Sequence, residues 1–185
     1  MIDWGEVSIV WVVERATGLT ALALLSLAVF LGAVTSAGWS SRRFPEVRSV
    51  LLHRNVSLLS LIFLAIHVVG VLADSYVDVP LSAVIVPFTS PYQTLGVALG
   101  TVAFDLTLAV LATSYLRDRM NRRAWFWIHA LTYVLWITAT VHALAAGYER
   151  ALTLFVAGMS ALLVVPAVLL RFTRPACTVE LEVTR

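Results

Sequence analysis

Residues 51–70, LLHRNVSLLSLIFLAIHVVG, are almost uniformly apolar but contain two histidines, His53 and His67. Twenty such residues are enough for an α-helix to cross a hydrocarbon core of about 30 Å. Ionisable side chains at that depth are costly, so they indicate a functional role. The stretch therefore predicts a membrane-spanning helix whose two imidazoles bind something.

The composition of the whole chain extends this prediction. Of the 185 residues, 60% are hydrophobic and 13% are charged, and the mean hydropathy is +0.90, values that exclude a soluble globule with a polar surface. We expect an all-α integral membrane protein built as a bundle of five transmembrane helices. The apolar runs lie at about 16–36, 50–73, 94–115, 126–146 and 152–171.

The distribution of charge predicts the orientation of the bundle. Every basic residue is an arginine, and arginines cluster after the first, third and fifth apolar runs, whereas acidic residues prevail at the opposite ends of the runs. The positive-inside rule then places the N-terminus outside and the C-terminus in the cytoplasm. Because topology accounts for the basic clusters, they do not indicate nucleic-acid binding.

These runs divide the chain into three parts. We expect an outer interfacial segment at 1–15, a membrane domain at 16–172 and a short cytoplasmic tail at 173–185. The first run lacks the basic flank and the cleavage site of a signal peptide, which predicts a retained span. The tail sequence CTVELEVTR alternates like a strand. Its Cys177 is the single cysteine, so neither an internal disulfide nor a C-x-x-C-H attachment site for c-type haem is expected.

Between the second and third runs, residues 74–93 form the longest loop, DSYVDVPLSAVIVPFTSPYQ. Its apolar centre is bracketed by Pro80, Pro87 and Pro91 and is too short to span a membrane. We expect a helix or turn here that lies on the outer face as a lid.

All four histidines lie in the second and fourth runs, which cross the membrane in the same direction. His53 and His129 are predicted near the inner face, and His67 and His142 near the outer face. The 14 residues from His53 to His67 correspond to about 21 Å and nearly four full turns, so both point from one side of the helix. The 13 residues from His129 to His142 leave the second ring about 140° from the first on an ideal helix.

Centres about 21 Å apart cannot share one Zn or Cu ion, because metal–ligand bonds are near 2 Å. Two facing imidazoles at each depth suit a haem iron with both axial positions filled. The spacing therefore favours two b-type haems stacked across the membrane. The alternative is that the histidines are core residues that form hydrogen bonds between helices.

The segments HRNVSLLSLIFLAIH and WFWIHALTYVLWITATVH resemble the ferric reductase-like transmembrane domain, which is shared by ferric reductases, NADPH oxidases and the haem subunit of bacterial methionine sulfoxide reductase systems. The resemblance covers about residues 12–172 and is nearest to the small actinobacterial branch. It implies transmembrane electron transfer in a bacterial cell membrane, with an inner haem on His53 and His129 and an outer haem on His67 and His142.

The resemblance also implies roles for charged residues. Arg15 stands where the family has an arginine close to the outer haem, and it can bind haem propionates or instead pair with Glu14 or extend to water. Arg54, Arg43 and Arg123 can do the same on the cytoplasmic side, or act only as topology signals.

Two further residues of the membrane domain are candidates for the cofactor environment. Asp105 lies near mid-membrane and can orient a ligand histidine, pair with an arginine or stay protonated. Trp127 can pack against haem, although aromatic residues at span ends more often belong to the interfacial belt.

The chain departs from the family in ways that bear on its activity. It ends with CTVELEVTR, whereas ferric reductases and NADPH oxidases continue into a flavin and NAD(P)H domain, and it has five spans where much of the family has six. Val71 stands where the oxidases have a polar residue, which weakens a superoxide-generating role. We therefore expect an oxidoreductase component, a cytochrome b subunit without its own flavin domain.

Three hypotheses follow for the function. The first is a di-haem cytochrome that carries electrons from a cytoplasmic flavin/NAD(P)H reductase, or from membrane quinol, to an outer-face acceptor such as a flavoprotein or a ferric chelate. The second is a haem-free assembly or transport subunit. The third is an autonomous quinol-oxidising cytochrome b.

Overall fold

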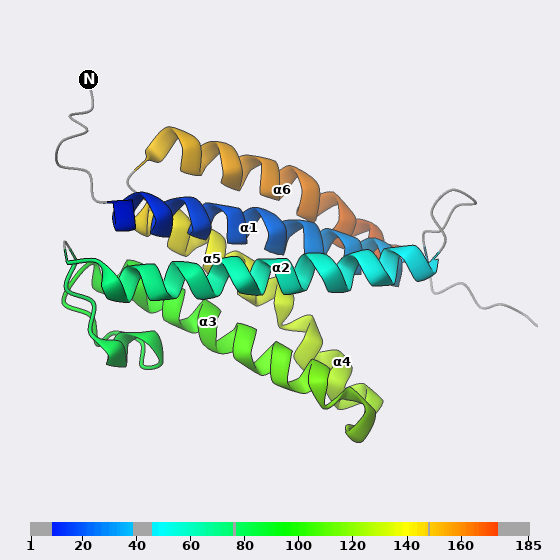
Figure 1. Ribbon diagram of the computed structural model, residues 1–185. Helices are drawn as coiled ribbons and strands as arrows, with labels where there is room; N and C mark the ends of the chain where they lie inside the picture. The colour runs from blue at the N-terminus through cyan, green and yellow to red at the C-terminus, as the bar shows by residue number, and fades with distance from the viewer. Residues whose placement is uncertain (1–8, 39–45, 76, 148, 174–185) are drawn as a thin grey trace, which may run out of the picture.

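The computed structural model describes residues 9–38, 46–75, 77–147 and 149–173, and within these ranges all regular structure is helical. The elements are α1 (Ile9–Ser36), α2 (Glu46–Ala73), η1 (Leu81–Val84), α3 (Thr94–Tyr115), η2 (Arg117–Arg119), α4 (Arg122–Ala130), α5 (Thr132–Ala146) and α6 (Arg150–Thr173) (Figure 1). The strand-like tail and Cys177 lie outside the described residues.

Within the described ranges, five helical segments are long and apolar enough to cross a membrane, with α4 and α5 together forming one of them. The predicted all-α, multi-pass membrane fold is therefore confirmed. One boundary differs from the expectation: α1 begins at Ile9 rather than near residue 16. As a result, Glu14 and Arg15 belong to the first helix and project from its second turn.

Helix α1 is the centre of the bundle, packed against α2 on one side and α6 on the other (Figure 1). Its contact with α2 includes a cluster of Ala28, Leu31 and Val56. The buried residues of α6 recur at intervals of four and three and are mostly small: Thr153, Ala157, Ser160, Val164 and Ala167. Such spacing forms one helical stripe, and small residues let two membrane helices approach closely.

Two hydrogen bonds join α1 to its neighbours. The Trp136 indole N–H of α5 donates to Ser26 Oγ at 3.0 Å, and Ser60 Oγ of α2 donates to the Ala21 carbonyl at 3.0 Å. Interhelical bonds of this kind contribute about 0.6 kcal/mol each on average in a bilayer. They tie α2 and α5 to the same stretch of α1.

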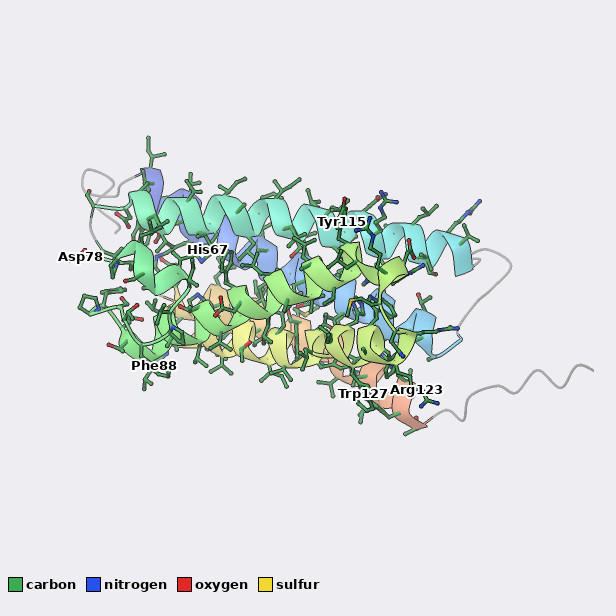
Figure 2. The ribbon with its side chains drawn as sticks, turned by 90° about the horizontal axis from the view of Figure 1, so that it is seen from below. His67, Asp78, Phe88, Tyr115, Arg123 and Trp127 are labelled. Carbon is green, nitrogen blue, oxygen red and sulfur yellow. The ribbon has the colours of Figure 1, made fainter. Side chains whose placement is uncertain are left out.

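The expected helix or turn between α2 and α3 is present as η1. It lies at the end of the bundle where Figure 2 labels Asp78 and Phe88, opposite the end that carries Arg123 and Trp127. Thr101 Oγ1 of α3 donates to the Ala83 carbonyl at 2.5 Å, which holds η1 against α3. The segment therefore covers one end of the bundle.

We predict that Ala157→Phe destabilises the bundle by about 1–3 kcal/mol, because Ala157 is only 7% exposed where α6 packs inside the bundle and overpacking forces side chains and backbone to shift. Leu162→Phe is the control, since Leu162 on the same helix is 70% exposed. Thermal unfolding in detergent measures both. Equal melting temperatures for the two variants would contradict this account of α6 packing.

Candidate functional site

The four histidines form two pairs that face each other across the bundle. The ring centroids of His53 and His129 are 6.2 Å apart with an interplanar angle of 70°, and those of His67 and His142 are 6.3 Å apart at 68°. These are the pairs that the sequence analysis placed at common depths. Two nearly identical arrangements therefore occur in one bundle, about 21 Å apart along α2.

The spacing of each pair fits one metal atom between the two rings. Metal–imidazole bonds of about 2 Å on either side of a shared atom put the ring centres about 6–6.5 Å apart. Within the described residues, no group of three or more histidine, cysteine, aspartate or glutamate side chains is arranged to hold a metal. Each pair thus has the geometry of two imidazoles on opposite sides of one metal atom.

Three of the imidazoles are oriented by main-chain carbonyls. Nδ1 of His53 lies 2.8 Å from the Ala28 oxygen. For His67 the partner is the Glu14 oxygen at 2.7 Å, and for His142 it is the Gly96 oxygen at 2.7 Å. Because a carbonyl only accepts, Nδ1 carries the proton in each case, and Nε2 keeps the lone pair that a metal needs.

Glycines make these approaches possible. A Cβ atom added to Gly18 would lie 2.9 Å from the His67 ring, and one added to Gly100 would lie 2.7 Å from the His142 ring. At Gly32 the corresponding distance to the His53 ring is 3.3 Å. Each of these glycines stands four residues after the carbonyl that the histidine contacts, so its missing side chain leaves the imidazole room against the helix.

His129 is the exception among the four histidines. Among the residues that the structure describes, its Nδ1 has no main-chain partner, and it lies 3.5 Å from Ser114 Oγ, at the limit of a hydrogen bond. The ring instead stacks on Trp125, with centroids 4.9 Å apart and an interplanar angle of 18°. His129 is thus held mainly by an aromatic contact.

All four histidines line one cavity of about 1170 Å³, bounded mainly by residues of α1 to α5, with further residues from α6, η1 and η2. A volume above the roughly 300–1,000 Å³ of sites for single drug-sized ligands leaves room for more than one such group. Between the two histidine pairs the lining is mostly apolar, with Leu25, Leu64 and Leu135 contributing from three helices. The cavity therefore connects the two histidine pairs along a mostly apolar path.

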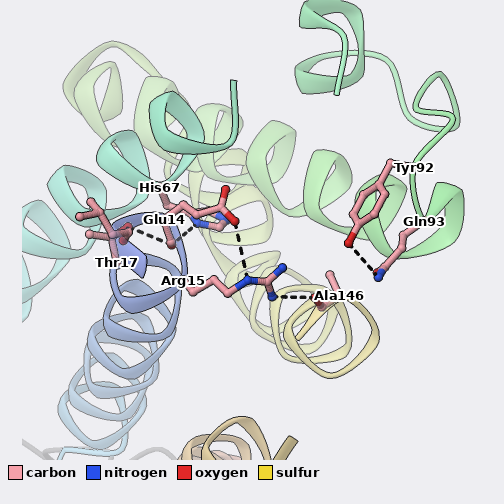
Figure 3. A network of polar contacts seen from close by, with 8 residues as sticks. Glu14, Arg15, Thr17, His67, Tyr92, Gln93 and Ala146 are labelled. Atoms are coloured by element: carbon pink, nitrogen blue, oxygen red, sulfur yellow. Dashed lines mark hydrogen bonds and ion pairs between the residues drawn. The ribbon is translucent and has the colours of Figure 1, made fainter. Parts of the chain in front are cut away.

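Arg15 crosses the cavity beside the His67–His142 pair (Figure 3). Its Nη1 donates to the Ala146 carbonyl on α5 at 3.2 Å, and its Nε lies 3.7 Å from Glu14 Oε1. The guanidinium also lies over the Trp11 ring at 4.9 Å. Glu14 is only 3% exposed and the Arg15 side chain is 21% exposed, so this end of the cavity carries a half-buried cation next to a buried acidic side chain.

At the other end, three arginines line the cavity near the His53–His129 pair: Arg54, Arg117 and Arg171. Arg171 donates to the Tyr133 hydroxyl and lies over the Phe126 ring at 5.3 Å. Arg117 lies over the Trp125 ring at 5.7 Å. The sequence analysis treated Arg117 and Arg171 only as orientation signals, since nothing in the linear sequence brings η2 and α6 to this site.

The remaining candidates lie elsewhere. Trp127 is 71% exposed, and it and Arg123 line a separate pocket at the start of α4 that includes no histidine; both lie at the end of the bundle far from His67 (Figure 2). Asp105 on α3 does not line the large cavity and is not hydrogen-bonded to any histidine. Arg43 lies outside the described residues.

The sequence analysis also missed the glycines. The signal was available, because Gly18 and Gly32 on α1 are separated by the same 14 residues as His53 and His67 on α2. On two helices that pack side by side in opposite directions, equal spacing sets two glycines opposite two histidines. Glycines on one helix that have the same spacing as histidines on a neighbouring helix therefore indicate an imidazole site in a membrane protein.

We predict that Gly100→Ala lowers stability while Gly158→Ala raises it by up to about 1 kcal/mol. Both changes favour helix formation to the same degree, but a Cβ at Gly100 collides with the His142 ring, whereas one at Gly158 meets open space. Unfolding in detergent compares the two variants. Stabilisation of both would contradict the close approach of His142 to α3.

Comparison with known proteins gives one match. Residues 17–140 match the family model described as "Ferric reductase like transmembrane component". The matched range covers most of the bundle and contains His53, His67 and His129, and it ends just before His142. Comparisons with curated proteins and with solved structures found no match.

Proposed function

The chain belongs to the ferric reductase-like transmembrane family, and on this basis we propose that it carries electrons across the membrane through two b-type haems. His53 and His129 would hold one haem, and His67 and His142 the other. When bound, haem iron takes up and releases one electron at a time. The observation that carries the proposal is the pair of facing imidazoles, found twice with ring centroids 6.2 and 6.3 Å apart.

The charged residues around the cavity support this assignment. A b-type haem carries propionates, which arginine binds in bidentate fashion. Arg15 is held in place between Glu14 and the Ala146 carbonyl beside the His67–His142 pair. Arg54 and Arg171 line the cavity near the other pair. We therefore assign Arg15 to the propionates at one centre and Arg54 and Arg171 to those at the other.

The second hypothesis, a haem-free assembly or transport subunit, fits the contacts less well. In such a protein the histidines would serve only as hydrogen-bonding groups between helices, and three of the four do bond to a carbonyl of a neighbouring helix. Those bonds do not account for the two rings that face each other in each pair. Among the described residues, the two rings of neither pair are hydrogen-bonded to each other, and three of the four rings point Nδ1 away from the partner ring toward a carbonyl. A proton relay across either pair would therefore lack the hydrogen bond between its two rings.

We infer the direction of transfer from the charges at the two ends. Seven described arginines lie at the end that holds His53 and His129: Arg48, Arg54, Arg117, Arg119, Arg122, Arg123 and Arg171. By the positive-inside rule this arginine-rich end lies on the cytoplasmic side of a bacterial cell membrane. Electrons then enter near His53 and His129 from a flavin/NAD(P)H reductase or a quinol. They leave near His67 and His142 to an outer flavoprotein or ferric chelate.

We predict that His67→Ala removes one haem and leaves the absorbance of the other largely intact, because the two histidine pairs lie about 21 Å apart. Haem content per chain and the reduced-minus-oxidised spectrum measure this. Val69→Ala is the control, since Val69 on the same helix is 64% exposed and should not affect either haem. A folded but colourless wild-type protein would end the proposal, and loss of both haems in folded His67→Ala would contradict independent centres.

The donor is tested with the same purified protein. If a separate flavoprotein supplies the electrons, a quinol analogue alone should leave the spectrum oxidised, and a flavin reductase with NAD(P)H should reduce it. Rapid reduction by the quinol analogue without any partner would instead favour the quinol-oxidising cytochrome.

A further inference from the structure

Beside three of the four histidines, the neighbouring helix supplies a carbonyl that the ring contacts and a glycine four residues later. Beside the fourth, His129, this glycine is replaced. On α1, the glycines at 18 and 32 are 14 residues apart. On α3, the residue 14 positions after Gly100 is Ser114 rather than a glycine. Ser114 is also the residue that His129 approaches, so it occupies the position that glycine holds beside the other three rings.

A serine at this position changes what His129 can reach. By analogy with the other three sites, the matching acceptor would be the Val110 carbonyl, four residues before Ser114. That carbonyl accepts from Thr113 Oγ1 at 3.2 Å. The polar contact of the His129 ring is with the Ser114 side chain, whose Oγ is 3.5 Å from Nδ1, and among the described residues the ring has no main-chain hydrogen bond.

We infer that Ser114 is a positioning residue that makes the centre at the arginine-rich end electronically different from the other one. This inference rests on the proposed haem function. An imidazole whose Nδ1–H is bonded to a carbonyl is a more basic ligand in a fixed tautomer. His129 lacks that bond and is the weakest electron donor of the four imidazoles. Weaker axial donation disfavours oxidised iron, which raises the reduction potential of the centre it serves.

The test is Ser114→Gly, which places a glycine beside His129 as Gly100 lies beside His142. The ring can then approach the Val110 carbonyl, so the midpoint potential of the haem at the arginine-rich end should fall while that of the other haem stays unchanged. Potentiometric titration monitored by absorbance and by electron paramagnetic resonance measures both. Ala112→Gly is the control, because it also introduces a glycine into α3, at a larger cost in helix propensity, two residues away at a position that does not line the cavity.

Repeating the substitution in a second variant assigns the change in midpoint potential to one haem. In His67→Ala, where only the haem at the arginine-rich end should remain, adding Ser114→Gly should again lower the single potential. Two wild-type haems whose potentials are unchanged by Ser114→Gly, or a shift confined to the other haem, would overturn this inference and leave the proposed function intact. A wild-type protein that binds no haem would overturn both.

Discussion

The arrangement of the bundle depends on hydrogen bonds from imidazoles to carbonyls that are already part of a helix. A carbonyl oxygen has two lone pairs, and in a helix one of them accepts from the N–H four residues ahead. The second is usually covered, because side chains project toward the helix N-terminus and lie over the preceding turn. Glycine leaves it accessible, and His53, His67 and His142 each use a carbonyl uncovered in this way.

This constraint sets how the helices pack. Two contacts of this kind hold α2 against α1, near both ends of the helix pair, and the same helices share the apolar cluster around Val56. On the far side of the cavity, Gly96 and Gly100 of α3 hold His142 of α5. The rings therefore project from α2 on one side and from α4 and α5 on the other. Helix backbones, which deform less than side chains, set the positions of three of the four rings.

Much of this could be predicted from the sequence, for identifiable reasons. Hydropathy over twenty residues marks a span regardless of its neighbours, and a helical rise of about 1.5 Å per residue gives the depth of each histidine. The functions of Gly18 and Arg171 could not be predicted in this way, because each depends on which helix lies opposite. Trp127 illustrates the same limit, since a residue at a helix end faces the cavity or the surroundings according to how that helix leaves the bundle.

The spacing of 13 residues between His129 and His142 does not match a whole number of helical turns, and a local irregularity in the helix compensates for the difference. An unbroken α-helix would leave the second ring about 140° from the first, yet the two histidine pairs have nearly identical geometry. The helix is interrupted at Leu131, whose N–H bonds to the Ile128 carbonyl three residues back at 3.0 Å, and Thr132 Oγ1 bonds to the His129 carbonyl at 2.8 Å. A tighter turn advances about 120° per residue instead of 100°. Together with the change of direction between α4 and α5 (Figure 1), the tighter turn brings His129 to the face that His142 uses.

The same interruption gives His129 its own short helix, in which Trp125 rather than a carbonyl orients the ring. The irregular spacing and the missing carbonyl contact thus occur together at one end of the site.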